Sequence, residues 1–109
     1  YWERYRRPIL IAETGIEDDE RPEWFRYVCE EVKIALDAGA QIEGICLYPI
    51  VNHPGWDDDR HCKNGLWCYP TDHGERETYQ PLADEIERQR LDFERRLARK
   101  EAKRRAAVA

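Results

Sequence analysis

Two short apolar runs, separated by an amphipathic segment, dominate the first half of the chain. Residues 8–12 (PILIA) form a continuous apolar run between charged sequence and Thr14-Gly15. This pattern predicts a strand buried on both faces. Residues 41–48 contain a second run, whose centre, Ile45, follows Ile9 by 36 residues. The spacing fits one strand-helix-strand unit and predicts that the two strands are parallel neighbours.

The segment between the two runs has the period of a helix. Pro22 suits a first helical turn, and Gly39 is a natural stop. Charged residues fall mainly outside the apolar stripe, as in a helix that covers a core with one face. The stripe recurs every four residues, at Trp24, Val28, Val32 and Leu36. We therefore expect a helix that begins near Pro22 and ends before Gly39.

The second half of the chain predicts a long loop and a final helix. Residues 49–78 are rich in Pro, Gly, Asn, Asp and His, and only residues 66–69 (LWCY) suggest a short extended piece. So long a loop in a compact domain is usually functional. A helix is expected from about Pro81, running into Arg- and Ala-rich sequence where we expect it to fray. Its thin apolar line comprises Leu82, Ile86, Phe93 and Leu97.

Length and composition limit the chain to one small, folded domain. It has 109 residues, of which 41% are hydrophobic and 38% charged, with four Trp, six Tyr and two Phe. This content of large apolar side chains excludes wholesale disorder. No apolar run approaches the roughly 18 residues that a membrane helix needs, so we expect no membrane partner.

The net charge of −5 conceals two unlike segments. Residues 1–87 carry 9 basic and 20 acidic side chains, a net charge of −11, whereas residues 88–109 carry 9 basic and 3 acidic, a net charge of +6. We therefore divide the chain into residues 1–88, an α/β unit, and residues 89–109, a charged helical tail.

Several features indicate a piece of a longer protein. The chain has no Met, and Tyr1 is too bulky for an ordinary N-terminus exposed by removal of an initiator Met. Two parallel strands bury little surface and leave their edges unpaired, so we expect the rest of a sheet elsewhere. Four cysteines without a secretory signal favour free thiols and a cytoplasmic location, although Cys62 and Cys68 would be able to pair in an exported protein.

Candidate chemistry collects where the two predicted strands end. Reactive groups of α/β folds lie beyond the carboxyl ends of parallel strands. The first strand leads to Glu13 and a glycine that allows a sharp turn. The second leads to Tyr48-Pro49 and then to polar and aromatic residues, among them Asn52, His53, Trp56 and Asp57.

These segments resemble the retaining glycoside hydrolases of clan A, and family 1 β-glucosidases in particular. Residues 8–15 (PILIAETG) resemble the family's seventh-strand motif, and residues 44–56 (GICLYPIVNHPGW) its eighth-strand motif. Residues 64–67 (NGLW) and Arg76 with residues 79–83 (YQPLA) extend the likeness over about residues 8–88. The resemblance implies an α/β fold that supplies the last two βα units, the seventh and eighth, of a (β/α)₈ TIM barrel, followed by the charged C-terminal helix.

The resemblance also implies residue roles. Glu13 falls on the catalytic nucleophile, and Trp56 on an aromatic that lines the sugar site. Tyr48 stands where the family has a Trp platform beneath the sugar, and Gly55 where it has a Glu that binds sugar hydroxyls. Further sugar contacts would then come from Asn52, His53, Asp57 and Trp67.

The implied reaction is the hydrolysis of an O-glycosidic bond in a carbohydrate substrate, without a cofactor. Retaining hydrolysis needs two carboxyl groups about 5–5.5 Å apart, one ionised and one protonated. Glu13 supplies the first, and the acid/base Glu of the family's fourth strand has no counterpart in this chain. We therefore expect these 109 residues to be inactive without the remaining barrel units. The family often has a cis peptide after the eighth-strand aromatic, and Tyr48-Pro49 would form one at low cost.

Two other classes of function remain open. One is a degenerate, non-catalytic barrel that only binds carbohydrate, favoured by the departures at Tyr48 and Gly55. The other is an interaction domain for metal or nucleic acid. The potential metal ligands are His53, Asp57, Asp59, His61, Cys62, Cys68 and His73. Their spacing is poor for zinc or calcium, so we expect no metal. The basic segment Arg88–Arg105 would attract nucleic acid, but it lacks a groove-reading motif, so we expect a solvated tail and no nucleic-acid partner.

Overall fold

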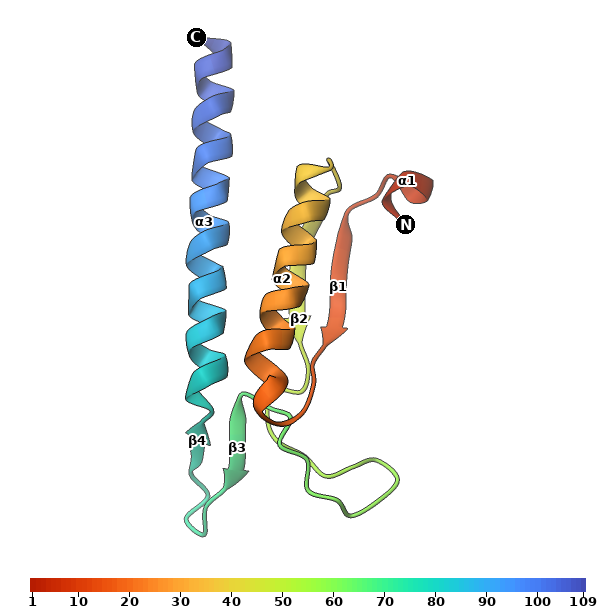
Figure 1. Ribbon diagram of the computed structural model, residues 1–109, viewed down its shortest axis with the longest axis vertical. Helices are drawn as coiled ribbons and strands as arrows, with labels where there is room; N and C mark the ends of the chain where they lie inside the picture. The colour runs from red at the N-terminus through yellow and green to blue at the C-terminus, as the bar shows by residue number, and fades with distance from the viewer.

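Two parallel strands and the helix that joins them form the centre of the fold (Figure 1). The computed structural model describes all residues, 1–109. In chain order the elements are α1 (Trp2–Tyr5), β1 (Ile9–Thr14), the 3₁₀ turn η1 (Asp18–Glu20), α2 (Arg21–Asp37), β2 (Ile42–Leu47), β3 (Trp67–Pro70), β4 (Arg76–Thr78) and α3 (Gln80–Val108). The molecule is therefore mixed α/β, with two separate two-stranded sheets.

The predicted strand-helix-strand unit is confirmed. Strands β1 and β2 pair in parallel, with Ile9 opposite Ile42 and Thr14 opposite Leu47. Helix α2 begins with Pro22 in its first turn and ends two residues before Gly39. Gly39 has a φ of +92°, a left-handed conformation that a residue with a β-carbon adopts only with strain, so a glycine suits this stop.

Helices cover only one face of the β1–β2 sheet. Ile45 and Leu47 of β2 pack against a core formed by Phe25, Cys29 and Leu82 of the two long helices. On the other face Leu10 is 57% exposed, and Cys46 is also exposed. The prediction of a strand buried on both faces is therefore wrong for this chain, because a single layer of helices leaves one side of the sheet open.

The second sheet is a small hairpin that the sequence predicted only in part. The expected extended piece at residues 66–69 corresponds to β3, which pairs antiparallel with β4. Strand β4 has only three residues, Arg-Glu-Thr, all of them exposed. No pattern in the sequence predicted it, because a short polar strand on a solvent face lacks apolar alternation.

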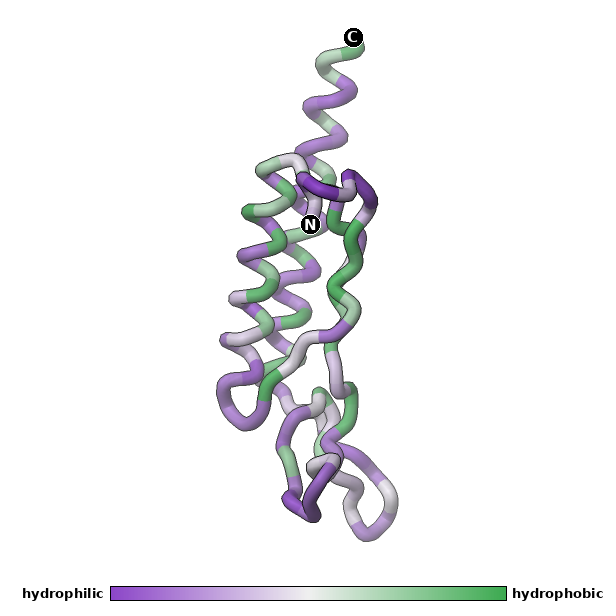
Figure 2. Tube along the Cα trace, turned by 90° about the vertical axis from the view of Figure 1, so that its right-hand side faces the viewer, coloured by the Kyte–Doolittle hydropathy of each residue, from purple (hydrophilic) through white to green (hydrophobic).

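Helix α3 continues through the Arg- and Ala-rich sequence to Val108, so the expected fraying is not found. Ala, Arg, Lys and Glu have high helix propensities, and they dominate this region. Figure 2 shows the end of α3 standing beyond the rest of the chain. The proposed division at residue 88 falls inside this continuous helix and stays a prediction. None of the helices is both long and apolar enough to cross a membrane.

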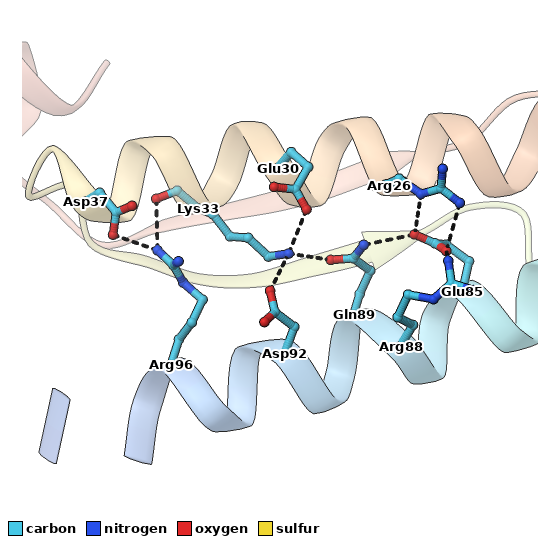
Figure 3. Close-up of polar contacts among 9 residues, drawn as sticks. All are labelled: Arg26, Glu30, Lys33, Asp37, Glu85, Arg88, Gln89, Asp92 and Arg96. Atoms are coloured by element: carbon cyan, nitrogen blue, oxygen red, sulfur yellow. Dashed lines mark hydrogen bonds and ion pairs between the residues drawn. The ribbon is translucent and has the colours of Figure 1, made fainter. Parts of the chain in front are cut away.

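Polar side chains, rather than apolar ones alone, join α2 to α3 (Figure 3). Glu85 is 1% exposed and accepts hydrogen bonds from Arg26 over 3.0 and 3.2 Å, and it also pairs with Arg88. Gln89 donates to the same carboxylate and accepts from Lys33 over 2.7 Å. These hydrogen bonds form a continuous network that joins α2 to α3 along their interface.

The positive and negative charges of the network between α2 and α3 are paired with each other within the interface. Burial, the largest single influence, pushes the pKa of Glu85 upward, but the hydrogen bonds from Arg26 and Gln89 and the charges of Arg26 and Arg88 hold it below its ordinary value. The Lys33 ammonium lies 2.8 Å from Glu30 and 2.6 Å from Asp92. At the far end Arg96 binds Asp37 over 2.6 Å. A buried charge that is paired and hydrogen-bonded in this way is tolerated.

Candidate functional site

The carboxyl ends of β1 and β2 are held together by their backbones. The Tyr48 amide donates a hydrogen bond to the Thr14 carbonyl over 2.9 Å, so the pairing continues past the end of β2. Directly after β1, Gly15 lies so close to the Tyr48 carbonyl that only a residue without a β-carbon fits. The Tyr48-Pro49 peptide bond is cis, as expected. The two chain segments that carry the candidate chemistry therefore lie side by side.

A hollow of about 1010 Å³ opens at these strand ends. Glu13, the penultimate residue of β1, lines it with an exposed side chain, and Tyr48 lines it from the end of β2. The complete lining comprises Glu13, Thr14, Gly15, Ile16, Glu17, Asp18, Asp19, Glu20, Trp24, Tyr48, Pro49 and Asn64. It contains five carboxylates and neither Lys nor Arg. The structure therefore brings the predicted nucleophile and the predicted platform residue to one acidic hollow.

His53 adjoins Tyr48 at the edge of this region. The Tyr48 hydroxyl lies 3.5 Å from His53 Nε2, and the two ring centroids are 5.9 Å apart. His53 Nδ1 donates to the Pro54 carbonyl over 2.7 Å, which in the neutral ring leaves Nε2 as the acceptor for the hydroxyl. The His53 amide in turn donates to Asn64 Oδ1 over 3.2 Å. These contacts fix the position of the imidazole beside the tyrosine.

Like His53, the other four predicted sugar contacts do not line the hollow. Asn52 is buried, and its Oδ1 accepts a hydrogen bond from the Gly65 amide over 2.7 Å, so this side chain shapes the loop. Trp67, on β3, is 39% exposed, and its carbonyl accepts from the Asn52 amide over 2.8 Å. Trp56 is 85% exposed and Asp57 is also exposed. Trp56, Asp57 and Trp67 therefore present their side chains to solvent in this chain.

Trp24 is a site residue that sequence reasoning assigned to the core. It lies in the first turns of α2, lines the hollow, and donates from Nε1 to Thr14 Oγ1 over 2.8 Å. This bond ties the beginning of the helix to the strand residue that follows Glu13. Its position shortly after the loop that leaves β1 was the available signal, because that part of a helix faces the strand ends in a βα unit.

The acidic loop beside Glu13 is held by two arginines. Arg60 donates to both oxygens of Glu17, over 2.7 and 2.9 Å, and this hydrogen bonding holds the pKa of Glu17 below its ordinary value. Arg21 is buried and donates to the carbonyls of Asp18 and Gly65, over 2.7 and 2.6 Å. The loops that follow β1 and β2 are therefore connected to each other through arginine side chains.

Tyr79 completes this support. Its ring lies 3.5 Å from the guanidinium carbon of Arg21, within cation–π distance. Its hydroxyl donates to Asp19 Oδ1 over 3.2 Å. Burial, with a further contribution from the Asp19 carboxylate, raises the pKa of Tyr79. The residue before α3 thus anchors the acidic loop that borders the hollow.

The structure brings together no set of three or more His, Cys, Asp or Glu side chains that would hold a metal ion. The proposed ligands around residues 53–73 are therefore not arranged as a metal centre. All four cysteines, Cys29, Cys46, Cys62 and Cys68, are free. The chemistry of the hollow thus rests on carboxylates and aromatic rings, with His53 adjoining Tyr48 at its edge.

The sequence matches no protein-family model and no curated protein. Among solved structures the fold resembles a hyperthermophilic β-glucosidase, a mutant that forms a dodecameric structure in the crystal, with a TM-score of 0.68 over 78% of the chain at 19% sequence identity. The chain spans about 20% of the length of that protein. The likeness is one of fold: this chain has a mixed α/β structure that resembles part of a β-glucosidase.

Proposed function

We propose that this chain supplies the seventh and eighth βα units of a (β/α)₈ barrel that hydrolyses β-linked glycosides with retention of configuration. The observation that carries the proposal is the placement of Glu13 and Tyr48 beside one hollow, at the carboxyl ends of two parallel strands. Barrel enzymes of this class assemble their sites at that end of the strands. The open face of the sheet, with Leu10 and Cys46 exposed, then turns toward the barrel interior.

In the proposed reaction Glu13 is the nucleophile. Its carboxylate attacks the anomeric carbon while the bond to the leaving oxygen breaks, and a protonated carboxyl group from another barrel strand donates the proton to that oxygen. The resulting glycosyl ester on Glu13 is then attacked by water, which the same second carboxylate deprotonates. Two inversions give net retention, and no cofactor takes part.

Sugar binding would rest on the residues that surround Glu13. The ring of Tyr48 offers an aromatic face to the apolar side of a sugar, and His53 beside it offers a hydrogen-bonding nitrogen. Trp56 and Asp57, in the segment between β2 and β3, are exposed, and so is Trp67 on β3. We propose that they complete the site with the remaining barrel units, whereas Asn52 acts by shaping the loop. The four free thiols support a cytoplasmic setting for this protein.

A covalent trap tests the assignment of Glu13 directly. A polypeptide that contains this chain together with the rest of its barrel is incubated with an activated 2-deoxy-2-fluoro glycoside, whose fluorine slows hydrolysis of the glycosyl ester. We expect one sugar per chain, located by peptide mass spectrometry on Glu13. The Glu13→Gln variant should lose turnover by several orders of magnitude while keeping its circular dichroism spectrum. Labelling of another carboxylate, or retained turnover in the variant, would overturn the role.

A degenerate barrel that only binds carbohydrate is the second candidate, because the side-chain oxygen of Asn52 is engaged with Gly65 and residue 55 is a glycine without any polar group. Such a protein would bind glycosides without forming the covalent ester. Binding measured by calorimetry, combined with no label on Glu13, would favour this candidate over the hydrolase.

A further inference from the structure

The second half of α3 carries an ordered cationic face that the proposed hydrolase does not use. Six basic residues lie between residues 95 and 104: Arg95, Arg96, Arg99, Lys100, Lys103 and Arg104. All of them belong to the continuous helix α3. At 3.6 residues per turn they fall within about half of the helix circumference, in two rows with an i, i+4 spacing of about 6 Å. A frayed tail would not hold them in this arrangement.

Most of these cations lack an acidic partner within the chain. Arg96 binds Asp37, and the other five form no ion pair. By contrast Arg90, which lies on the opposite side of the helix, pairs with Glu87 and Glu94. The face therefore presents about five uncompensated positive charges over roughly 14 Å of helix.

Arg96 contacts Asp37 and the Lys33 carbonyl at the end of α2, and the part of the face beyond it is separated from the acidic remainder of the molecule. Figures 1 and 2 show the end of α3 projecting beyond α2 and both sheets. Residues 1–87 carry a net charge of −11 and would repel a polyanion, so a polyanion is directed to the projecting helix. Four of the six cations are Arg, whose planar guanidinium suits the paired oxygens of a phosphate.

We propose that residues 95–104 form a docking site for the phosphate backbone of double-stranded DNA, independent of base sequence. An α-helix with side chains is about 10–12 Å wide, and the major groove of B-DNA is about 12 Å wide, so the helix fits with its two cationic rows directed at the flanking strands. The half of the helix opposite the cations carries Leu97, Ala98, Glu101, Ala102 and Arg105, and with two charged residues and only one large apolar side chain it is too polar for insertion into a lipid surface. The proposal thus differs from the expectation, based on sequence alone, of a solvated tail.

The test is the salt dependence of binding to a fluorescein-labelled duplex of mixed sequence, measured by anisotropy with the full chain. Five phosphate contacts predict that log K falls with log salt with a slope of about −4.5, a loss of about 500-fold between 50 and 200 mM salt. The Arg95→Gln/Arg99→Gln variant should have a slope shallower by about 1.8. Circular dichroism of each variant verifies that α3 remains helical.

A matched control separates the face from net charge. Arg90→Gln/Arg105→Gln also removes two positive charges, but from the opposite side of α3, and should leave the slope unchanged. Equal slopes for the two double variants would overturn the proposal, as would the absence of binding at 50 mM salt. Polyglutamate or anionic lipid vesicles that displace the duplex at equal charge concentration would also overturn it, in favour of an acidic protein or a membrane.

Discussion

The backbone of Gly15 lies so close to the carbonyl oxygen of Tyr48 that a β-carbon on Gly15 would stand 1.9 Å from it. The contact occurs one residue beyond the point where the Tyr48 amide bonds the Thr14 carbonyl. Because both partners are backbone, neither moves aside without separating the two strand ends. The distance between Glu13 and the aromatic ring of Tyr48 therefore depends on this glycine.

Replacing Gly15 with Ala should destabilise the chain and disturb the site. We expect the free energy of unfolding to fall by about 1–3 kcal/mol, the usual cost of overpacking against an immobile neighbour. The midpoint of urea unfolding measures the effect. Gly44→Ala is the matched control, because its β-carbon would meet only the flexible end of the Leu10 side chain, at 2.8 Å. Equal losses in the two variants would contradict the importance of the backbone contact.

The buried carboxylate of Glu85 should contribute more to stability than an exposed one on the same helix. Glu85→Gln removes the charge that faces Arg26 and Arg88, and we expect a loss of about 1–3 kcal/mol, the cost of leaving buried hydrogen-bonding groups poorly matched. Glu87 is exposed on the same helix and pairs only with Arg90. Glu87→Gln should therefore change stability little. Thermal unfolding of both variants would show whether burial makes this difference.

Stability should also fall in mild acid because of Glu85. Its pKa is lower in the folded chain than in the unfolded chain, so its contribution is complete above the unfolded value of about 4.3 and is lost as the pH falls through the folded value. Urea unfolding between pH 6 and pH 3 should therefore show a steeper decline for the natural chain than for Glu85→Gln. Parallel curves for the two proteins would assign the acid sensitivity to other carboxylates.

Thiol labelling should distinguish the open sheet from a completed barrel. In the 109-residue chain Cys46 is exposed and should be alkylated by iodoacetamide at pH 8, whereas burial of Cys29 raises its pKa to about 11 and should keep it unreacted. In a longer polypeptide that carries the whole barrel, Cys46 should also be protected. Peptide mass spectrometry measures both rates, and rapid labelling of Cys46 in the longer polypeptide would contradict a barrel interior at this face.

The βαβ unit was predictable because local and tertiary signals agree there. The apolar runs around Ile9 and Ile45 and the stop at Gly39 match the strands and the helix within one or two residues. Strand β4 was not predictable, because its three exposed polar residues are held by pairing with β3 rather than by their own preference. The end of α3 was wrongly predicted to fray. It has few packing contacts, but its residues have high helix propensities and the helix continues to Val108.

Only the residues of the candidate site that lie at the ends of strands were predictable from the sequence. Glu13 and Tyr48 follow directly from the ends of β1 and β2, and the structure places both at the hollow. Trp24 and Asn64 were missed, since their proximity to Glu13 and His53 depends on how the helix and the loop return to the strand ends. The role of Asn52 in the loop was also not predictable, because the sequence does not distinguish an Asn that hydrogen-bonds a loop backbone from an Asn that contacts a ligand.

The contacts of Arg21 have a consequence for loop engineering. One guanidinium binds a carbonyl in the loop after β1, a carbonyl in the loop after β2, and the ring that precedes α3. The two loops are therefore not interchangeable modules, and replacing either one with a loop from another α/β protein would leave a buried cation without its acceptors. A successful transplant would have to carry Arg21, Gly65 and Tyr79 together, so the lining of the hollow is more readily altered through single side chains at its rim than through whole-loop exchange.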